Sequence, residues 1–62
     1  MAGKFVLSKT RNGGYTWVLK AANGETIAQS ETYTTKAAAK NGIDSVKRNA
    51  GDAPTDDQTG EG

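Results

Sequence analysis

The chain has 62 residues and a formal net charge of +1, and it contains no cysteine and no histidine. The length allows at most one small domain with a thin hydrophobic core. No disulfide or Cys/His zinc site is available to stabilise this domain. A second copy of the chain is the simplest further source of buried area, so a homodimer is expected. No secretory signal is visible and the apolar runs are far too short to span a bilayer, which predicts a cytoplasmic protein with no membrane partner.

Charge is distributed unevenly. Residues 1–50 hold all eight lysines and arginines against three carboxylates, a net +5, whereas residues 51–62 hold four carboxylates and no base. From Asp52 onward there is no large apolar side chain to offset the entropy of ordering the backbone. The sequence therefore predicts one domain over residues 1–51 and a disordered acidic tail over residues 52–62.

Three strands are predicted in the first half of the chain, at Lys4 to about Lys9, at Tyr15 to Lys20 and at Thr26 to about Ser30. The third has only one large apolar residue and is the weakest. The connections at residues 10–14 and 21–25 each contain an Asn-Gly pair, and these residues tolerate the positive φ of tight hairpin turns. This spacing predicts an antiparallel β-meander with the second strand in the middle.

Apolar side chains occupy both faces of the first two strands. Phe5 and Trp17 belong to one face, while Val6 and Val18 take the other, because side chains alternate along a strand. One helix can cover only one of these faces, which is a second reason to expect a dimer with Val6 or Val18 at or near the interface. The residues predicted to form the core and the dimer contact are Phe5, Val6, Trp17, Val18, Leu19, Ile43 and Val46.

The hydrophobic period changes after Tyr33, which is expected to fill the junction between the third strand and a helix. Thr34 or Thr35 can cap this helix, and an apolar stripe continues through it at Ala39, Ile43, Val46 and Ala50. Gly51 falls where the helix should end. The predicted fold is therefore α+β, a three-stranded antiparallel meander followed by one C-terminal helix.

The pair Asn41-Gly42 lies inside the predicted helix, although it is a turn signal and glycine costs about 1 kcal/mol relative to alanine there. The apolar stripe runs through the pair in phase, so the helix is predicted to be continuous. Gly42 is then expected where the helix passes close to a strand.

No catalytic residue, metal ligand or cofactor site is predicted. Without histidine and cysteine the commonest general base and the best thiol nucleophile are missing, and no serine has the context of an activated nucleophile. Asp56, Asp57 and Glu61 lack the alternating spacing of a calcium loop, and no glycine-rich phosphate-binding motif is present. The chain is therefore predicted not to be an enzyme.

Nucleic-acid binding is the alternative function. A three-stranded sheet backed by one helix can present a strand face to a groove, and four bases lie on or beside the first two strands. Such binding would be weak and salt-sensitive, because the net charge is modest and the bases are scattered. The predicted contact residues are Lys4, Lys9, Arg11 and Lys20.

Taken together and in order, many segments resemble the DUF1508 (UPF0339, YegP-like) domains over about residues 4–50. The resemblance implies a β-β-β-α unit that often occurs as two tandem copies, of which this chain holds one, so a lone unit is expected to pair with itself. Relatives often carry bases on the second strand where this chain has Thr16 and Val18, which weakens a basic-surface role. No biochemical activity follows from the resemblance. The matching segments are Lys4–Lys9, Gly14-Tyr15 with Trp17, Leu19–Glu25, Ile27-Ala28, Ser30-Glu31 with Tyr33, Lys36–Ala39, and Asn41–Ile43 with Ser45–Lys47.

The function predicted from the sequence is therefore that of a small, uncharacterised, non-enzymatic protein. It is expected to act through self-association and through interaction with a protein partner that the sequence does not identify.

Overall fold

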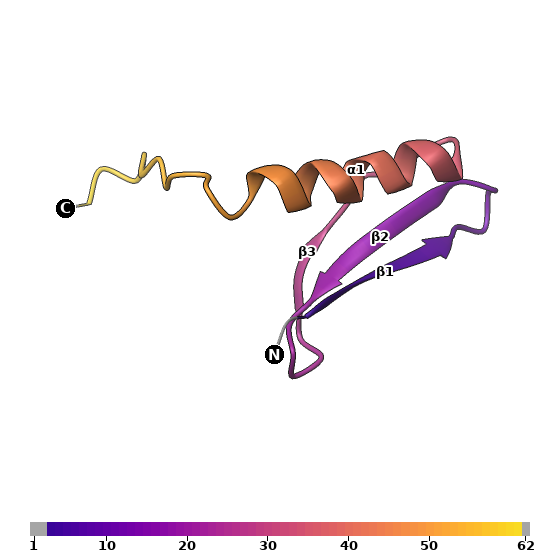
Figure 1. Ribbon diagram of the computed structural model, residues 1–62, viewed down its shortest axis with the longest axis horizontal. Helices are drawn as coiled ribbons and strands as arrows, with labels where there is room; N and C mark the ends of the chain where they lie inside the picture. The colour runs from indigo at the N-terminus through magenta and orange to yellow at the C-terminus, as the bar shows by residue number, and fades with distance from the viewer. Residues whose placement is uncertain (1–2, 62) are drawn as a thin grey trace.

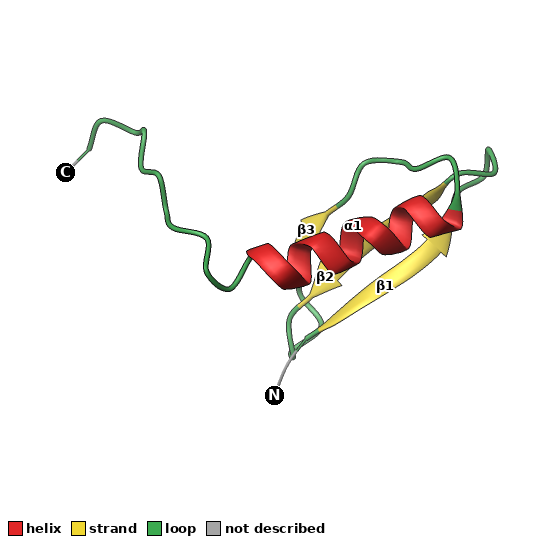
Figure 2. Ribbon diagram, turned by 45° about the horizontal axis from the view of Figure 1, so that its top comes forward, coloured by secondary structure: helices red, strands yellow, loops and turns green. Residues whose placement is uncertain are grey.

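The computed structural model describes residues 3–61. Strands β1 (Lys4–Lys9), β2 (Tyr15–Lys20) and β3 (Thr26–Gln29) form an antiparallel sheet in the order β1-β2-β3, and helix α1 (Lys36–Asn49) follows. Helix α1 lies over one face of this sheet (Figure 1, Figure 2). The predicted α+β fold, a meander followed by one helix, is confirmed.

Two glycine-containing turns connect the strands as predicted. Gly13 and Gly24 have φ angles of 86° and 89°, a region that side-chain-bearing residues rarely adopt. In the first turn the Thr10 N–H donates to the Gly14 carbonyl at 2.8 Å, and in the second the Ala21 N–H donates to the Glu25 carbonyl at 2.8 Å. Both Asn-Gly signals therefore mark true hairpins.

The register of β1 and β2 divides their side chains between the two faces of the sheet. Leu7 lies opposite Trp17 and faces α1, whereas Val6 lies opposite Val18 and faces away from the helix. Among residues 3–61 the buried hydrophobic side chains are those of Trp17, 6% exposed, and Ala39, 0% exposed. The core of a single copy is therefore thin, as the length of the chain implied.

Strand β3 is the shortest and most exposed of the three strands, and the sequence predicted it to be the weakest. Its four residues are all exposed, Ile27 is 62% exposed, and the pairing with β2 shifts register between Leu19 and Lys20. Ser30 lies just beyond the strand but still joins it to β2, because the Ser30 N–H donates to the Trp17 carbonyl and the Ser30 hydroxyl accepts from the Trp17 N–H, both at 2.9 Å.

Helix α1 begins where a threonine caps it. The Thr35 hydroxyl accepts a hydrogen bond from the Ala38 N–H at 3.0 Å, so Thr35 rather than Thr34 is the N-cap. The helix continues through Asn41-Gly42, as the apolar stripe predicted. It ends at Asn49, with Ala50 as a right-handed C-cap, and Gly51 follows without adopting positive φ. The C-terminus therefore does not use the left-handed glycine cap that a glycine at this position can supply.

Gly42 lies where the helix meets the aromatic side chains beneath it. A Cβ atom added at Gly42 would collide with Tyr33 Oη and lie 3.3 Å from Trp17 Nε1. The buried indole N–H of Trp17 has no hydrogen-bond partner in the part of the chain that the structure describes. The expected close approach is thus to Tyr33, which fills the junction between β3 and α1, and to Trp17 of β2.

Residues 51–61 are exposed and extend away from the sheet beyond the C-terminal end of α1 (Figure 1). Side-chain hydrogen bonds within this segment join its own residues to one another. For example, the Thr59 hydroxyl and N–H both donate to the Asp57 carboxylate and hold the pKa of that group below its usual value. Within residues 3–61, α1 is too short and too polar to cross a membrane.

Candidate functional site

Strand β1 is an edge strand, and the hydrogen bonds of β2 indicate which of its backbone groups point outward. Tyr15 exchanges two bonds with Tyr33, at 2.8 and 2.7 Å, and the Trp17 carbonyl accepts from the Ser30 N–H at 2.9 Å. The odd-numbered residues of β2 thus direct their N–H and C=O groups toward the third strand and its extension. Because these directions alternate along a strand, the N–H and C=O groups of the even-numbered residues point toward β1.

The same alternation fixes the outward groups of β1. Val6 pairs with Val18, an even-numbered residue, so the backbone groups of Val6 point into the sheet. The backbone groups of Phe5, Leu7 and Lys9 therefore point away from β2, toward the free edge. This edge offers a row of donors and acceptors that a further strand can pair with.

A groove runs between β1 and α1, because the helix packs mainly against β2. It consists of two hollows of about 420 and 330 Å³ that share Leu7. Phe5 and Ile43 add to its apolar floor, and both are half-buried. We call this feature the β1–α1 groove. The residues that line it are Phe5, Leu7, Ser8, Lys9, Tyr15, Lys36, Lys40, Ile43, Asp44 and Lys47.

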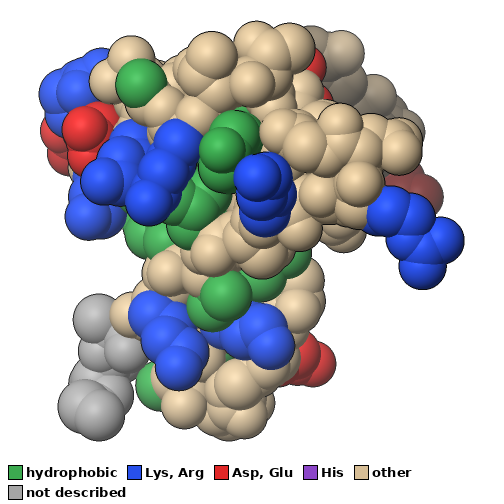
Figure 3. All heavy atoms as spheres, turned by 90° about the vertical axis from the view of Figure 1, so that its right-hand side faces the viewer, with side chains coloured by type: hydrophobic (Ala, Val, Ile, Leu, Met, Phe, Trp, Pro, Cys, Tyr) green, Lys and Arg blue, Asp and Glu red, His purple; other side chains and the backbone are tan. Residues whose placement is uncertain are grey.

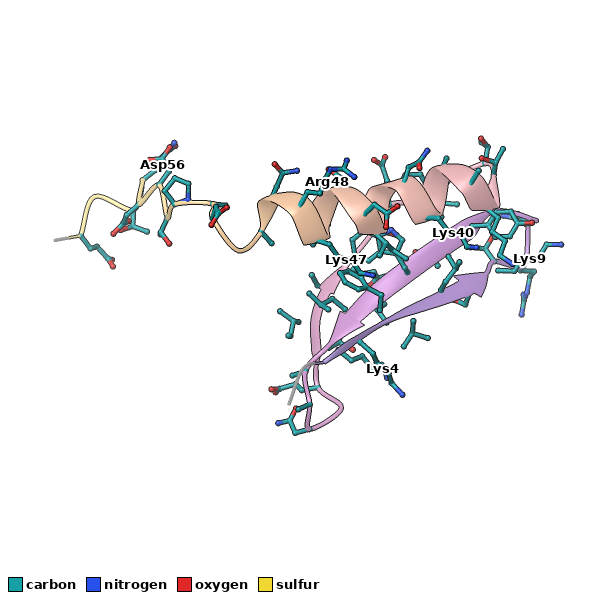
Figure 4. All side chains as sticks on the ribbon, viewed as in Figure 1. Lys4, Lys9, Lys40, Lys47, Arg48 and Asp56 are labelled. Carbon is teal, nitrogen blue, oxygen red and sulfur yellow. The ribbon has the colours of Figure 1, made fainter. Side chains whose placement is uncertain are left out.

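Four lysines line this groove, and we call them the lysine strip: Lys9, Lys36, Lys40 and Lys47. Lys40 and Lys47 extend from the helix toward the sheet, whereas Arg48 lies on another side of α1 (Figure 4). Asp44 is the only carboxylate among the groove residues. The groove therefore combines an apolar floor with a positively charged rim.

Two lysines of the strip lie over aromatic rings. The Lys9 ammonium is 5.9 Å from the centroid of the Tyr15 ring, and the Lys47 ammonium is 5.8 Å from the centroid of the Phe5 ring. Both distances are within the range of a cation–π interaction. The Phe5 ring also packs edge-on against Trp17, with centroids 5.3 Å apart and an angle of 77°. Phe5 thus links the groove to the core.

The four bases predicted to contact nucleic acid do not form one cluster. Lys4 and Lys20 lie opposite each other at one end of the sheet, while Lys9 lies opposite Tyr15 at the other end and Arg11 follows in the turn. On the side of the molecule shown in Figure 3, blue basic side chains form separate groups beside green apolar ones. Lys4 and Lys20 share the sheet face with Val6, whereas Lys9 faces the helix.

The residues predicted for the core and the dimer contact divide between the two sheet faces. Leu19, Ile43 and Val46 are half-buried on the helix side with Phe5 and the buried Trp17. Val6 and Val18 are half-buried on the face that α1 does not cover. Their role in a dimer stays a prediction.

Sequence reasoning missed the three helical lysines of the strip, although a signal was present. At 100° per residue, Lys36, Lys40 and Lys47 fall within about 40° of one another around the helix. This narrow stripe borders the apolar stripe at Ile43, so the sequence already indicated that the lysines would line the edge of the covered face.

Few of the described residues are arranged in a way that suits metal binding or catalysis. Within residues 3–61, no group of three or more Asp, Glu, His or Cys side chains is arranged to hold a metal ion. A third hollow, of about 380 Å³, lies between the β1–β2 turn and the β3–α1 connection and is lined by threonines, glycines, Asn12 and Tyr33. Its lining contains no carboxylate and no amine that could act as a general base.

These features define a small β-β-β-α domain with a free sheet edge and a basic groove, and comparison with known proteins places this domain in a family. The model of DUF1508, a domain of unknown function, matches residues 11–57. The chain belongs to the DUF1508 family.

Individual relatives agree with this assignment. The chain is 56% identical over 50 residues to the UPF0339 protein YegP of Shigella flexneri, a match that covers 81% of this chain and 46% of that protein. It is 49% identical over 53 residues to a UPF0339 protein of Treponema denticola, covering 86% and 91%. The chain thus spans about half the length of the first relative and nearly all of the second.

A solved structure supports the fold. The NMR solution structure of a protein from Haloferax volcanii matches with a TM-score of 0.78 and 38% identity, over 90% of this chain and 95% of that chain. The names of these relatives state no enzymatic activity, ligand or partner.

Proposed function

We propose that this domain is a non-enzymatic self-association module that forms a homodimer by pairing the β1 strands of two copies. The observation that carries the proposal is the free edge of β1, where the backbone groups of Phe5, Leu7 and Lys9 point outward. The dimer would offer a protein partner a single sheet with two helices on one side.

The outward groups favour one register. In an antiparallel pair of identical strands related by a two-fold axis perpendicular to the sheet, opposite residues share a face and both helices lie on the same side. Phe5 of one copy can then exchange hydrogen bonds with Leu7 of the other. Val6 lies beside its own counterpart at the axis, with Cα atoms about 4.5 Å apart. In this register apolar residues lie opposite each other, and no lysine of one β1 strand lies opposite a lysine of the other.

The exposed area of one copy also favours association. A compact protein of 6.5 kDa is expected to expose about 3,800 Å², and this chain exposes 5032 Å². The extended tail accounts for part of the difference, and the half-buried side chains of Phe5, Leu7 and Ile43 add to it. Joining two β1 strands would cover the outer side of Phe5 and Leu7 with the same residues of the partner copy.

The length of the relatives is consistent with pairing. The chain matches about half of the Shigella flexneri relative, which leaves room there for a second unit in the same chain. In a chain with one unit, a second molecule would take the place of that second unit.

A pair of matched variants tests the proposal. Val6→Lys would set two ammonium groups beside each other at the two-fold axis, which costs about 1–3 kcal/mol and weakens the dimer about five- to 150-fold. Val18→Lys adds the same charge to the same sheet face one strand away, so it should leave dimerisation unchanged. Light scattering coupled to size-exclusion chromatography measures the mass, and Trp17 fluorescence reports that each variant is folded.

Three results would refute the proposal: a monomer at every accessible concentration of the unmodified chain, a Val6→Lys variant that remains fully dimeric, or equal weakening by Val6→Lys and Val18→Lys. The last result would move the interface from the β1 edge to the whole uncovered face of the sheet.

Nucleic-acid binding through Lys4, Lys9, Arg11 and Lys20 is the weaker candidate. Lys4 and Lys20 lie at the opposite end of the sheet from Lys9 and Arg11, and Lys9 faces the helix while Lys4 and Lys20 do not. A single strand of nucleic acid would have to cross from one face of the sheet to the other to contact all four.

A further inference from the structure

We propose that the β1–α1 groove binds single-stranded nucleic acid, with phosphates on the lysine strip and bases against the rings of Phe5 and Tyr15. The proposal shares Lys9 with the four strand bases considered above, but its other three cationic residues come from α1. It also does not depend on dimerisation, because every residue it uses belongs to one copy.

The charge of the groove favours a polyanion. The lysine strip places four cations along one groove that holds a single carboxylate, that of Asp44. From Lys36 to Lys47 the helix rises about 16 Å, so the charges form a row rather than a point. A row of ammonium groups along a groove suits a linear polyanion, which it can follow phosphate by phosphate.

Two aromatic rings lie in the groove beside the lysines. Phe5 and Tyr15 are half-buried, and each has a lysine ammonium within 6 Å of its centroid. When a base stacks on the ring, this flexible lysine would leave the ring face and move to a phosphate. Aromatic side chains between basic ones in a groove provide stacking surfaces for bases whose phosphates contact the cations. Such stacking requires unpaired bases, since a duplex keeps its base faces covered. The groove therefore favours a single strand over a duplex.

The groove stays open in the proposed dimer. The two β2 strands would be separated by three strand spacings, about 14 Å, and the helices lie mainly over β2. Directly packed helices are 8–10 Å apart, so a trough would remain between the helices, lined by the lysine strips of both copies. The dimer would thus contain two copies of the site, and both would stay open.

Binding of a fluorescently labelled oligothymidylate, followed by anisotropy at increasing salt, tests the proposal. Each phosphate neutralised contributes a slope of about −0.7 to log K against log salt for a single strand, so four lysines give about −2.8. Affinity should then fall about fiftyfold between 50 and 200 mM salt.

Two double variants with the same charge change locate the site. Lys40→Gln with Lys47→Gln removes half of the lysine strip, so the slope should fall to about −1.4 and the same salt step should cost only about sevenfold. Lys4→Gln with Lys20→Gln, on the other face of the sheet, should leave affinity and slope unchanged. At a concentration where it is monomeric, the Val6→Lys variant should retain the slope, which separates this proposal from the proposed dimer.

Four results would overturn the proposal. They are no binding at 50 mM salt, equal weakening by the two double variants, tighter binding of a duplex of the same length, and displacement of the oligothymidylate by polyglutamate at equal charge concentration. The last would identify the groove as a site for acidic peptides.

Discussion

Replacing Gly42 by alanine sets two effects of opposite sign against each other. In a helix interior alanine is favoured over glycine by about 1 kcal/mol. Against this, the new methyl group would overlap Tyr33 Oη, lie 3.0 Å from Tyr33 Cζ and lie 3.3 Å from Trp17 Nε1. Overpacking of this kind typically costs about 1–3 kcal/mol.

The balance predicts that Gly42→Ala lowers the free energy of unfolding by up to about 2 kcal/mol. In a domain of this size each kcal/mol corresponds to about 4–8 °C in Tm, so thermal unfolding followed by circular dichroism resolves the effect. Gly51→Ala is the matched control, because a Cβ there meets no atom within 4 Å and its φ is not positive. The control should leave Tm unchanged or raise it slightly.

A double-mutant cycle tests the cause. Tyr33→Phe removes the hydroxyl that the methyl group would strike, so Gly42→Ala should cost less in that background than in the unmodified chain. A Tm that rises on Gly42→Ala alone, or a cost that is the same in both backgrounds, would refute the account of how α1 packs against Tyr33.

Three further variants test other parts of the structure. Thr35→Ala should cost about 1 kcal/mol in urea unfolding by removing the N-cap of α1, whereas Thr34→Ala should cost little; equal costs would contradict the assignment of the cap. Ser30→Ala should cost about 1–3 kcal/mol, because the Trp17 N–H loses its acceptor, and an unchanged unfolding midpoint would show that this bond is replaceable. Deleting residues 52–62 should leave Tm unchanged and raise the affinity for oligothymidylate, since it removes four carboxylates; a lower Tm would show that the tail packs on the domain.

The strands and the helix could be predicted from the sequence because their signals are local. The Asn-Gly pairs at the two turns require positive φ at glycine, and the alternation around Trp17 fixes the face that the helix covers. A continuous helix through Gly42 could not be predicted from local signals alone, since the Asn41-Gly42 pair is typical of a turn. The helix is continuous because packing of its apolar stripe against the sheet stabilises it more than one glycine destabilises it.

The candidate site could be predicted only in part. The sequence indicates that Val6 and Phe5 face opposite sides of the sheet, but it does not indicate which residues of β1 direct their backbone groups to the free edge. That depends on the phase of the hydrogen bonds between Tyr15 and Tyr33, a contact across eighteen positions of the chain. The groove likewise depends on where α1 sits across the sheet, over β2 rather than β1.

Amide hydrogen exchange at Phe5 and Leu7, measured by NMR in dilute and concentrated samples, tests the central claim of pairing through β1 most directly. The proposed dimer predicts that these two outward amides exchange more slowly as concentration rises, while the Val6 amide, already bonded within the sheet, changes little. Rapid exchange of Phe5 and Leu7 at every concentration, or slowing confined to β3, would contradict the account.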